Sequence, residues 1–166
     1  ENCFQWVPPL VSSVKASMNR QKYPFYNHSD ADFFLAEDGG EVLGRIAVLE
    51  NRRYNEYNHR KAAFFYDFDA IDDTAVANAL FDAAADWAAQ RGLNILYGPK
   101  GFLRSDAPGI LIEGFEHRAA LSMPYNYDYY PRLLETAGFE KEIDYLSGYV
   151  TEGHDLEGRF YDLAEK

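Results

Sequence analysis

Residues 61–97 decide the fold, and they read KAAFFYDFDAIDDTAVANALFDAAADWAAQRGLNILY. The segment 61–68 is apolar on both faces of an extended chain, which is typical of a central strand covered on both sides. The short run 94–97 is a second apolar strand, and residues 73–91 between the two have a helical pattern. Two strands joined by a helix usually run parallel in one sheet, so this stretch predicts an α/β fold.

The helix between these strands has signals at both ends. Asp72, Asp73 and Thr74 are of the types that cap a helix N-terminus, and the two carboxylates favour the positive end of the helix dipole. Apolar side chains then recur at helical spacing, at Val76, Leu80, Ala84 and Trp87. Gly92 provides the left-handed conformation that ends many helices, so we expect one helix with a single buried face.

A β-hairpin precedes this unit. Residues 32–37 are expected to form one strand and residues 41–49 its antiparallel return. Between them, Asp38-Gly39-Gly40 supplies the positive φ angles of a tight turn.

The remaining N-terminal segments give weaker signals. Residues 4–10 are expected to be extended, because each proline disfavours a helical conformation in the residue before it. A short amphipathic helix is expected within residues 10–21, and the polar residues 51–60 are expected to form a loop.

The C-terminal part predicts one more helix and one more strand. Residues 129–137 have an amphipathic pattern, with Pro131 tolerated in the first turn and Gly138 as the stop. Residues 139–150 are expected to form a final strand or hairpin. The tail 151–166 is either a linker or a closing helix.

Composition excludes several classes of function. The 166 residues fit one domain, and their net charge of -11 would repel a phosphate backbone, so nucleic acid is not an expected partner. The same charge would attract cationic ligands such as amines. No apolar stretch has the length of a membrane span, so we expect no membrane partner and a cytoplasmic location. With the single Cys3 and scattered histidines, no metal site is predicted.

The order of these elements resembles the GNAT (general N-acetyltransferase) superfamily over residues 32–150. The strings AFFYDFD (63–69), YGP (97–99), GILIEGF (109–115) and YYPRLLE (129–135) are similar to a poorly characterised bacterial GNAT-like branch. Members of that branch are often longer and begin with a segment similar to WVPPL (6–10), preceded by a first strand. The resemblance implies one GNAT-like domain over 1–166, lacking that first strand and belonging to a longer chain. Its sheet would be mixed and mostly antiparallel, with a central parallel strand pair that splays apart, and with flanking helices.

The resemblance also implies that acetyl-CoA or another acyl-CoA binds where the two parallel strands diverge. The diphosphate would lie on the N–H groups at the start of the helix 73–91, an anion site in many proteins. The family motif there is Gln/Arg-x-x-Gly-x-Gly/Ala, and residues 72–77 depart from it, with Asp72 in place of the cation and Ala75 in place of the first glycine. The alternative is that Asp72 and Asp73 only cap the helix. The residues implied to contact the cofactor are Phe68, Ala70, Ile71, Thr74, Ala75, Ala77 and Asn126.

Catalytic candidates follow from the same resemblance. Family members commonly have a tyrosine that acts as the general acid four residues before Gly-Phe, and that position is Leu134 here. Tyr130, one helical turn earlier, either takes over the role of that tyrosine or is a core residue. Asp67 and Asp69 are candidate general bases, which share a face if the strand stays regular, although Asp69 could instead belong to the turn. The predicted substrate cleft contains Tyr66, Tyr97 and Lys100.

Two functions remain open at this point. One is an acyl-CoA-dependent N-acyltransferase that acts on a small amine. The other is a non-catalytic GNAT-like binding or scaffold module of a longer, tandem protein with a degenerate cofactor site. A second domain and a homodimer are both left open as partners.

Overall fold

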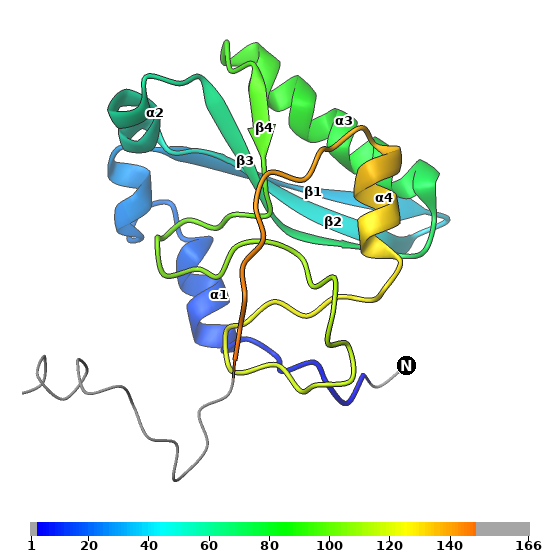
Figure 1. Cartoon of the computed structure of the whole chain (residues 1–166). Helices are drawn as coiled ribbons and strands as arrows, with labels where there is room; N and C mark the ends of the chain where they lie inside the picture. Colours follow the sequence, from blue (N-terminus) through cyan, green and yellow to red (C-terminus); the bar gives the residue numbers. More distant parts are fainter. Residues whose placement is uncertain (1–2, 149–166) are drawn as a thin grey trace, which may run out of the picture.

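The computed structural model describes residues 3–148 (Figure 1). In chain order, its elements are α1 (Val11–Ser17), the 3-10 helix η1 (Pro24–Asn27), β1 (Asp30–Asp38), β2 (Glu41–Glu50), α2 (Arg52–Asn58), β3 (Ala62–Ala70), α3 (Thr74–Gln90), β4 (Ile95–Tyr97) and α4 (Tyr130–Thr136). The predicted linker or helix at 151–166 lies outside the described residues.

The strands form one mixed sheet in the order β1-β2-β3-β4. β1 pairs antiparallel with β2, and β2 antiparallel with β3. β4 runs parallel to β3, with Ala62 opposite Ile95 and Phe64 opposite Tyr97. The predicted α/β fold, mostly antiparallel with one parallel pair and flanking helices, is confirmed.

The β1–β2 hairpin is also confirmed. Its turn lies at Gly39 and Gly40, whose φ angles are 57° and 85°. Two successive positive φ angles favour glycine, because a Cβ atom would strain both positions.

Helix α3 begins and ends where the sequence predicts. The Oδ1 atom of Asp73 accepts the N–H of Ala75 at 2.7 Å, and Gly92 follows the helix with a φ of 71°. One face of α3 is buried against the sheet, through Val76, Ala77, Leu80, Phe81, Ala84, Trp87 and Ala88. Each fully buried large side chain of this kind contributes about 1.5–3 kcal/mol, so this interface is a main source of stability. Helix α4 covers the same face through Leu133 and Leu134.

A smaller aromatic cluster covers the opposite face of the sheet. Phe25 of η1, Phe64 of β3 and Phe102 of the loop after β4 are its large buried members. The rings of Phe25 and Phe102 lie edge to face with centroids 5.0 Å apart. The cluster therefore fixes the loop after β4 to the sheet.

Three predicted segments differ from the structure. The polar stretch 51–60 is not only a loop, because it contains α2, which Asn51 caps by accepting the N–H of Tyr54 at 3.0 Å. Helix α1 is shorter than residues 10–21 and buries no side chain. The predicted final strand is wrong for residues 139–148, and residues 149–150 lie outside the described part. The reason is that residues 140–148 are all exposed, so no surface orders them as a strand.

Candidate functional site

The parallel strands part just beyond their three paired residues. The backbone N–H of Lys100 donates to the carbonyl of Phe65 at 2.8 Å. Beyond Lys100 the chain leaves the sheet as an irregular loop, whereas β3 continues to Ala70 (Figure 1). At Gly98 a Cβ atom would lie 2.6 Å from the carbonyl oxygen of Phe65. Glycine therefore permits the close approach that precedes this divergence.

A β-bulge interrupts β3 beside this point. Tyr66 lies opposite Ala47 and Asp69 opposite Arg45, so two residues of β3, Asp67 and Phe68, face a single residue of β2. Asp67 has a φ of 49°, a left-handed conformation that is uncommon outside glycine. The bulge removes the regular alternation on which the prediction of a shared face for Asp67 and Asp69 rested.

The carboxyl group of Asp67 is half-buried and accepts no hydrogen bond from another residue within 3–148. Burial raises its pKa, Arg45 opposes that shift, and the negative charges of Asp106 and Asp69 add to it. A carboxyl group with unfilled acceptor capacity and a raised pKa is suited to accept a proton. The neighbouring Tyr66 has its pKa raised to about 12, first by burial and then by Asp67 and Asp106.

Tyr130 fastens α4 to the end of β3. Its hydroxyl donates to the carboxylate of Asp69 and accepts the N–H of Ala70 at 3.3 Å. The neighbouring Tyr129 hydroxyl donates to the Ala70 carbonyl at 2.8 Å. Burial and the Asp69 carboxylate raise the pKa of Tyr130, so its proton is held more firmly than in a free tyrosine. Tyr130 therefore acts as a buried structural contact, and Asp69 is its exposed partner.

The start of α3 carries acidic side chains where the resemblance implies a diphosphate. The Asp73 carboxylate accepts the Ala75 N–H, and Asp72 forms an ion pair with Arg132 of α4. Ala77 is completely buried and donates its N–H to the Asp73 carbonyl at 3.1 Å. The capping interpretation of Asp73 is confirmed, and the two carboxylates place negative charge at the helix start where the resemblance implies a diphosphate.

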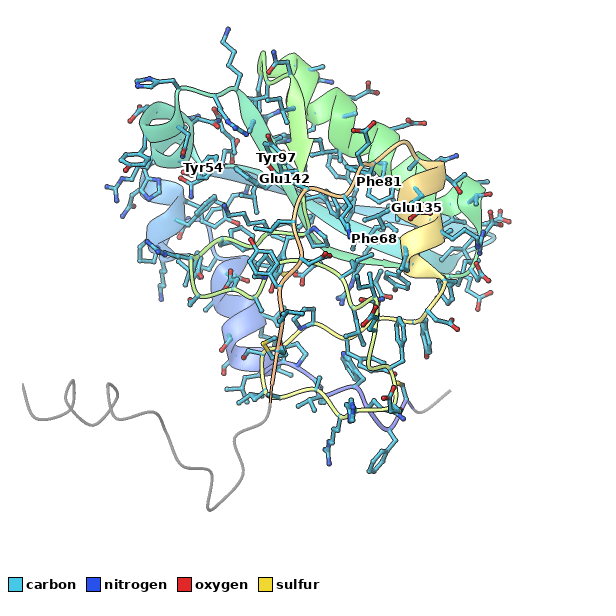
Figure 2. All side chains as sticks on the ribbon, in the orientation of Figure 1. Tyr54, Phe68, Phe81, Tyr97, Glu135 and Glu142 are labelled. Carbon is cyan, nitrogen blue, oxygen red and sulfur yellow. The ribbon has the colours of Figure 1, made fainter. Side chains whose placement is uncertain are left out.

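The other residues that the resemblance implies to contact a cofactor differ in how far they are buried. Ala70 is buried, Ile71 is exposed and Thr74 is half-buried. Phe68 stacks on Phe81 at 4.6 Å between ring centroids and packs against the core beside α4 (Figure 2).

Asn126 holds a loop together. Its side chain accepts the Leu111 N–H at 2.7 Å and donates to the carbonyls of Leu111 and Tyr127. Its hydrogen-bonding groups are thus used inside the protein.

Two of the predicted cleft residues, Tyr97 and Lys100, lie together. The ammonium of Lys100 lies 4.3 Å from the ring centroid of Tyr54 and 5.0 Å from that of Phe64, on which Tyr97 stacks at 6.1 Å. Burial lowers the pKa of Lys100, and Glu142 opposes that shift. Figure 2 labels Tyr54, Tyr97 and Glu142 in this region. Tyr54, Tyr66 and Tyr97 all pack against the same aromatic cluster, so the predicted cleft residues share one face of the sheet.

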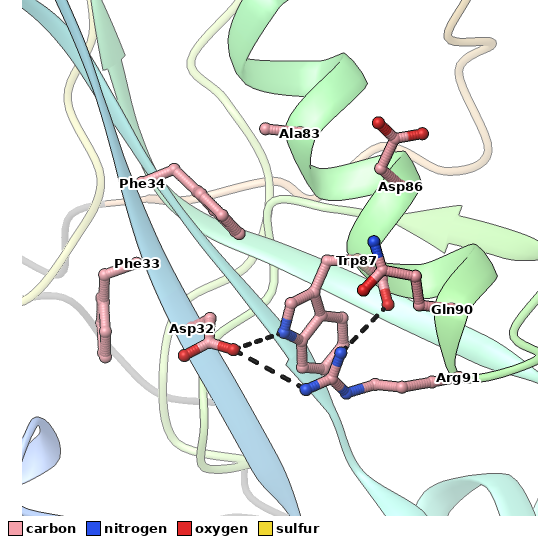
Figure 3. A pocket seen from close by; sticks show the side chains of 8 residues that line it. All are labelled: Asp32, Phe33, Phe34, Ala83, Asp86, Trp87, Gln90 and Arg91. Carbon is pink, nitrogen blue, oxygen red and sulfur yellow. Dashed lines mark hydrogen bonds and ion pairs between the residues drawn. The ribbon is translucent and has the colours of Figure 1, made fainter.

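A groove of about 470 Å³ runs beside Tyr97, lined also by Leu96 and residues 138–142. A second groove of about 470 Å³ lies between β1 and α3 (Figure 3). There the Trp87 indole N–H donates to Asp32 at 2.6 Å, and the Arg91 guanidinium stacks over the Trp87 ring at 3.7 Å. These side chains interact with one another, so we interpret the second groove as a packing feature and not as a ligand site.

No sequence pattern singles out Asp106 or Tyr54. Asp106 resembles an ordinary turn residue, and Tyr54 lies in a polar stretch expected to be only a loop. Within residues 3–148, no three His, Cys, Asp or Glu side chains are arranged as metal ligands. In the same part of the chain, no helix combines the length and apolar character needed to cross a membrane.

Comparison with known proteins gives two relatives. No protein-family model matches the chain, and no solved structure matches it. Protein YghO of Escherichia coli is 30% identical over 145 residues, which cover 87% of this chain and 37% of that protein. A bacterial ceramide synthase of Caulobacter vibrioides is 30% identical over 152 residues, which cover 91% of this chain and 40% of that protein. The chain thus spans about two fifths of the length of these relatives, and its mixed sheet is consistent with a GNAT-like fold.

Proposed function

We propose that this chain carries the catalytic centre of an N-acyltransferase, which transfers an acyl group from a thioester to an amine. The observation that carries the proposal is the half-buried Asp67 carboxyl group on the bulge where β3 and β4 separate. The carboxyl ends of parallel strands are common ligand sites in α/β proteins. The name of the Caulobacter relative supports the same chemistry, because a ceramide contains an amide formed from a fatty acyl group and an amine.

Asp67 has the properties of a general base for this reaction. An amine is largely protonated at neutral pH, and Asp67 would take one proton from its ammonium group directly or through one water. The neutral amine then attacks the thioester carbonyl, the C–N bond forms and the C–S bond breaks. The second amine proton leaves with the thiol product.

Acidic groups around Asp67 favour a cationic acceptor. Asp69 and Asp106 both act on it electrostatically, and Arg45 is the opposing cation. Together with the net charge of -11, this arrangement would attract an ammonium group more than a neutral alcohol. We propose a small amine as the acceptor, with a long-chain amine as the first alternative to assay because of the ceramide synthase relative.

We propose that the acyl donor is a thioester whose binding does not require a contact between a diphosphate and the start of α3. Acyl-CoA is the donor that the resemblance implies, but Asp72 and Asp73 are already placed at the start of α3. We therefore expect acyl-pantetheine, which lacks the diphosphate, to bind about as well as the matching acyl-CoA. Titration calorimetry with both compounds tests this expectation, and a much tighter acyl-CoA complex would refute it.

A second candidate function follows from the same α3 contacts. The Asp73 carboxylate accepts the Ala75 N–H at the helix start where the resemblance implies a diphosphate. This contact supports a non-catalytic module of a longer protein, with a degenerate cofactor site. Absence of binding heat for both thioesters would favour that module over the enzyme. Turnover of any amine by this chain would exclude it.

A further inference from the structure

Two aromatic rings meet where α2 packs against β3. The ring of Tyr54 lies edge to face on the ring of Phe64, with centroids 5.0 Å apart. The side chain of Asn55 fixes α2 to the strand, because it donates to the Ala62 carbonyl at 2.9 Å and accepts the Ala62 N–H at 3.1 Å. The faces of the Tyr54 and Phe64 rings therefore form a fixed surface, which we call the aromatic site.

The aromatic site holds the ammonium group of Lys100. Its nitrogen lies 4.3 Å from the ring centroid of Tyr54 and 5.0 Å from that of Phe64, and both distances are within the range of about 6 Å for a cation–π contact. Within residues 3–148, this ammonium group forms no hydrogen bond and no ion pair. Among the described residues, only the ring faces hold its charge in place.

Arg60 is a nearby cation that is held more firmly. Its guanidinium group lies 5.7 Å from the ring centroid of Tyr97 and also donates a hydrogen bond to the Tyr97 hydroxyl. Lys100 has no such second contact in the described chain, and its ammonium group ends a flexible four-carbon side chain. Another ammonium group can therefore take its place on the rings and restore the same cation–π attraction.

The charges around the aromatic site also favour a cation. Burial lowers the pKa of Lys100, and the carboxylate of Glu142 opposes that shift by favouring the charged form. Glu142 lines the groove beside Tyr97 (Figure 2). With a net charge of -11 on the whole chain, an ammonium ion from solution would be attracted to the place that the Lys100 side chain fills.

The aromatic site lies on the same strand as Asp67. Phe64 and Asp67 are three residues apart on β3, which corresponds to about 10 Å along a strand. An amine whose nitrogen gives its proton to Asp67 cannot place that same nitrogen on the rings. A ligand that uses both places therefore needs two amino groups.

We propose that the aromatic site binds the second, non-reacting ammonium group of a diamine acceptor, and that Lys100 occupies the site until the acceptor displaces it. The inference rests on the proposed function, in which Asp67 is the base for the reacting amino group. The ring faces select a positive charge, because they attract a cation more strongly than a neutral group of the same size.

The binding test uses tetramethylammonium, an ammonium ion that cannot be acylated, so that binding is measured apart from chemistry. Dissociation constants come from NMR titration followed through the ring signals of Tyr54 and Phe64. Lys100→Ala opens the aromatic site and is expected to bind this ion about 2- to 30-fold more tightly than the wild type, the range for one cation–π contact. Lys100→Arg keeps a cation on the rings and is expected to bind as weakly as the wild type. In Lys100→Ala, neutral tert-butanol should bind more weakly than tetramethylammonium.

Matched variants separate the rings from the general effect of charge. Lys61→Ala removes a charge from an exposed lysine immediately before β3 and should leave the dissociation constant unchanged. Added to Lys100→Ala, Tyr54→Leu should abolish the gain in affinity, whereas Tyr57→Leu should keep it, since Tyr57 is on the same helix and 86% exposed. The inference is overturned if Lys100→Ala binds no more tightly than Lys100→Arg, or if Tyr54→Leu keeps the gain.

Acylation assays connect the aromatic site to the proposed function. For hexane-1,6-diamine, KM is expected to fall in Lys100→Ala by the same factor as the dissociation constant, whereas KM for hexylamine should not change. Equal changes for the two amines would contradict a site for the second ammonium group. If the wild type acylates no amine, the proposed function is wrong, and the tetramethylammonium constants alone then decide whether the aromatic site binds ammonium ions.

Discussion

Replacing Asp67 by glycine should stabilise the protein relative to replacing it by alanine. The backbone φ of Asp67 is 49°, and the left-handed conformation costs a residue with a Cβ atom about 1–2 kcal/mol. Glycine avoids that cost but loses about 0.5–1 kcal/mol through its larger conformational freedom in the unfolded chain. The net expectation is that Asp67→Gly is more stable than Asp67→Ala by about 0–1.5 kcal/mol, with a central value of about 0.75 kcal/mol, since both variants lack the carboxyl group.

The same pair of substitutions at Asp69 is the control. Asp69 follows the bulge and has no positive φ, so glycine there should be less stable than alanine by about 0.5–1 kcal/mol. Urea unfolding followed by circular dichroism measures all four variants. For a chain of this size, the central difference at position 67 corresponds to a melting temperature about 1.5–3 °C higher for the glycine variant. If glycine is the less stable residue at both positions, the bulge as described is wrong.

Three further substitutions test the packing and electrostatics around the site. Gly44→Ala places a Cβ atom 2.8 Å from the Asp69 carbonyl oxygen and 2.9 Å from Leu80, so we expect a loss of about 1–3 kcal/mol in urea unfolding, and wild-type stability would contradict this contact. Tyr130→Phe leaves the Ala70 N–H without its acceptor and should cost about 1–3 kcal/mol by the same assay, whereas no loss would show that the hydroxyl contact is unimportant. Burial raises the pKa of Asp67 from its usual 3.8, so the folded state binds that proton more tightly than the unfolded chain and loses stability as pH rises above that value. Asp67→Asn should therefore be more stable than the wild type at pH 7, with a gain that disappears below about pH 4, and a pH-independent difference in thermal unfolding would refute the raised pKa.

The sheet could be predicted because its local signals agree with one another. Residues 61–97 contain the buried strand, the capped helix and the second strand, and each signal is contained in a few neighbouring residues. The hairpin at Gly39 and Gly40 is similarly local. Residues 140–148 were harder to predict, because whether they become a strand depends on a packing partner that sequence spacing does not reveal.

The chemistry of the site was only partly predictable for the same reason. Asp67 could be selected as a carboxylate near the end of a central strand, but its bulged backbone depends on the register between β2 and β3. The loop after β4 is distant in sequence from the bulge, and its place against the sheet depends on Phe102 packing against Tyr66. Tyr130 could be placed on a helix, whereas its bond to Asp69 required the tertiary contact between α4 and β3.

The most direct test of the account is to measure amide formation by this chain and by its Asp67→Asn variant. The protein is incubated with a carbon-13-labelled acyl thioester and a panel of small and long-chain amines, and amide and released thiol are quantified by mass spectrometry. We expect one thiol released for each amide formed, with a rate about 10²–10⁴-fold lower in Asp67→Asn, as for the loss of a general base. Equal rates in the two proteins, or no amide from any amine, would contradict the assignment of Asp67 as the base of an N-acyltransferase.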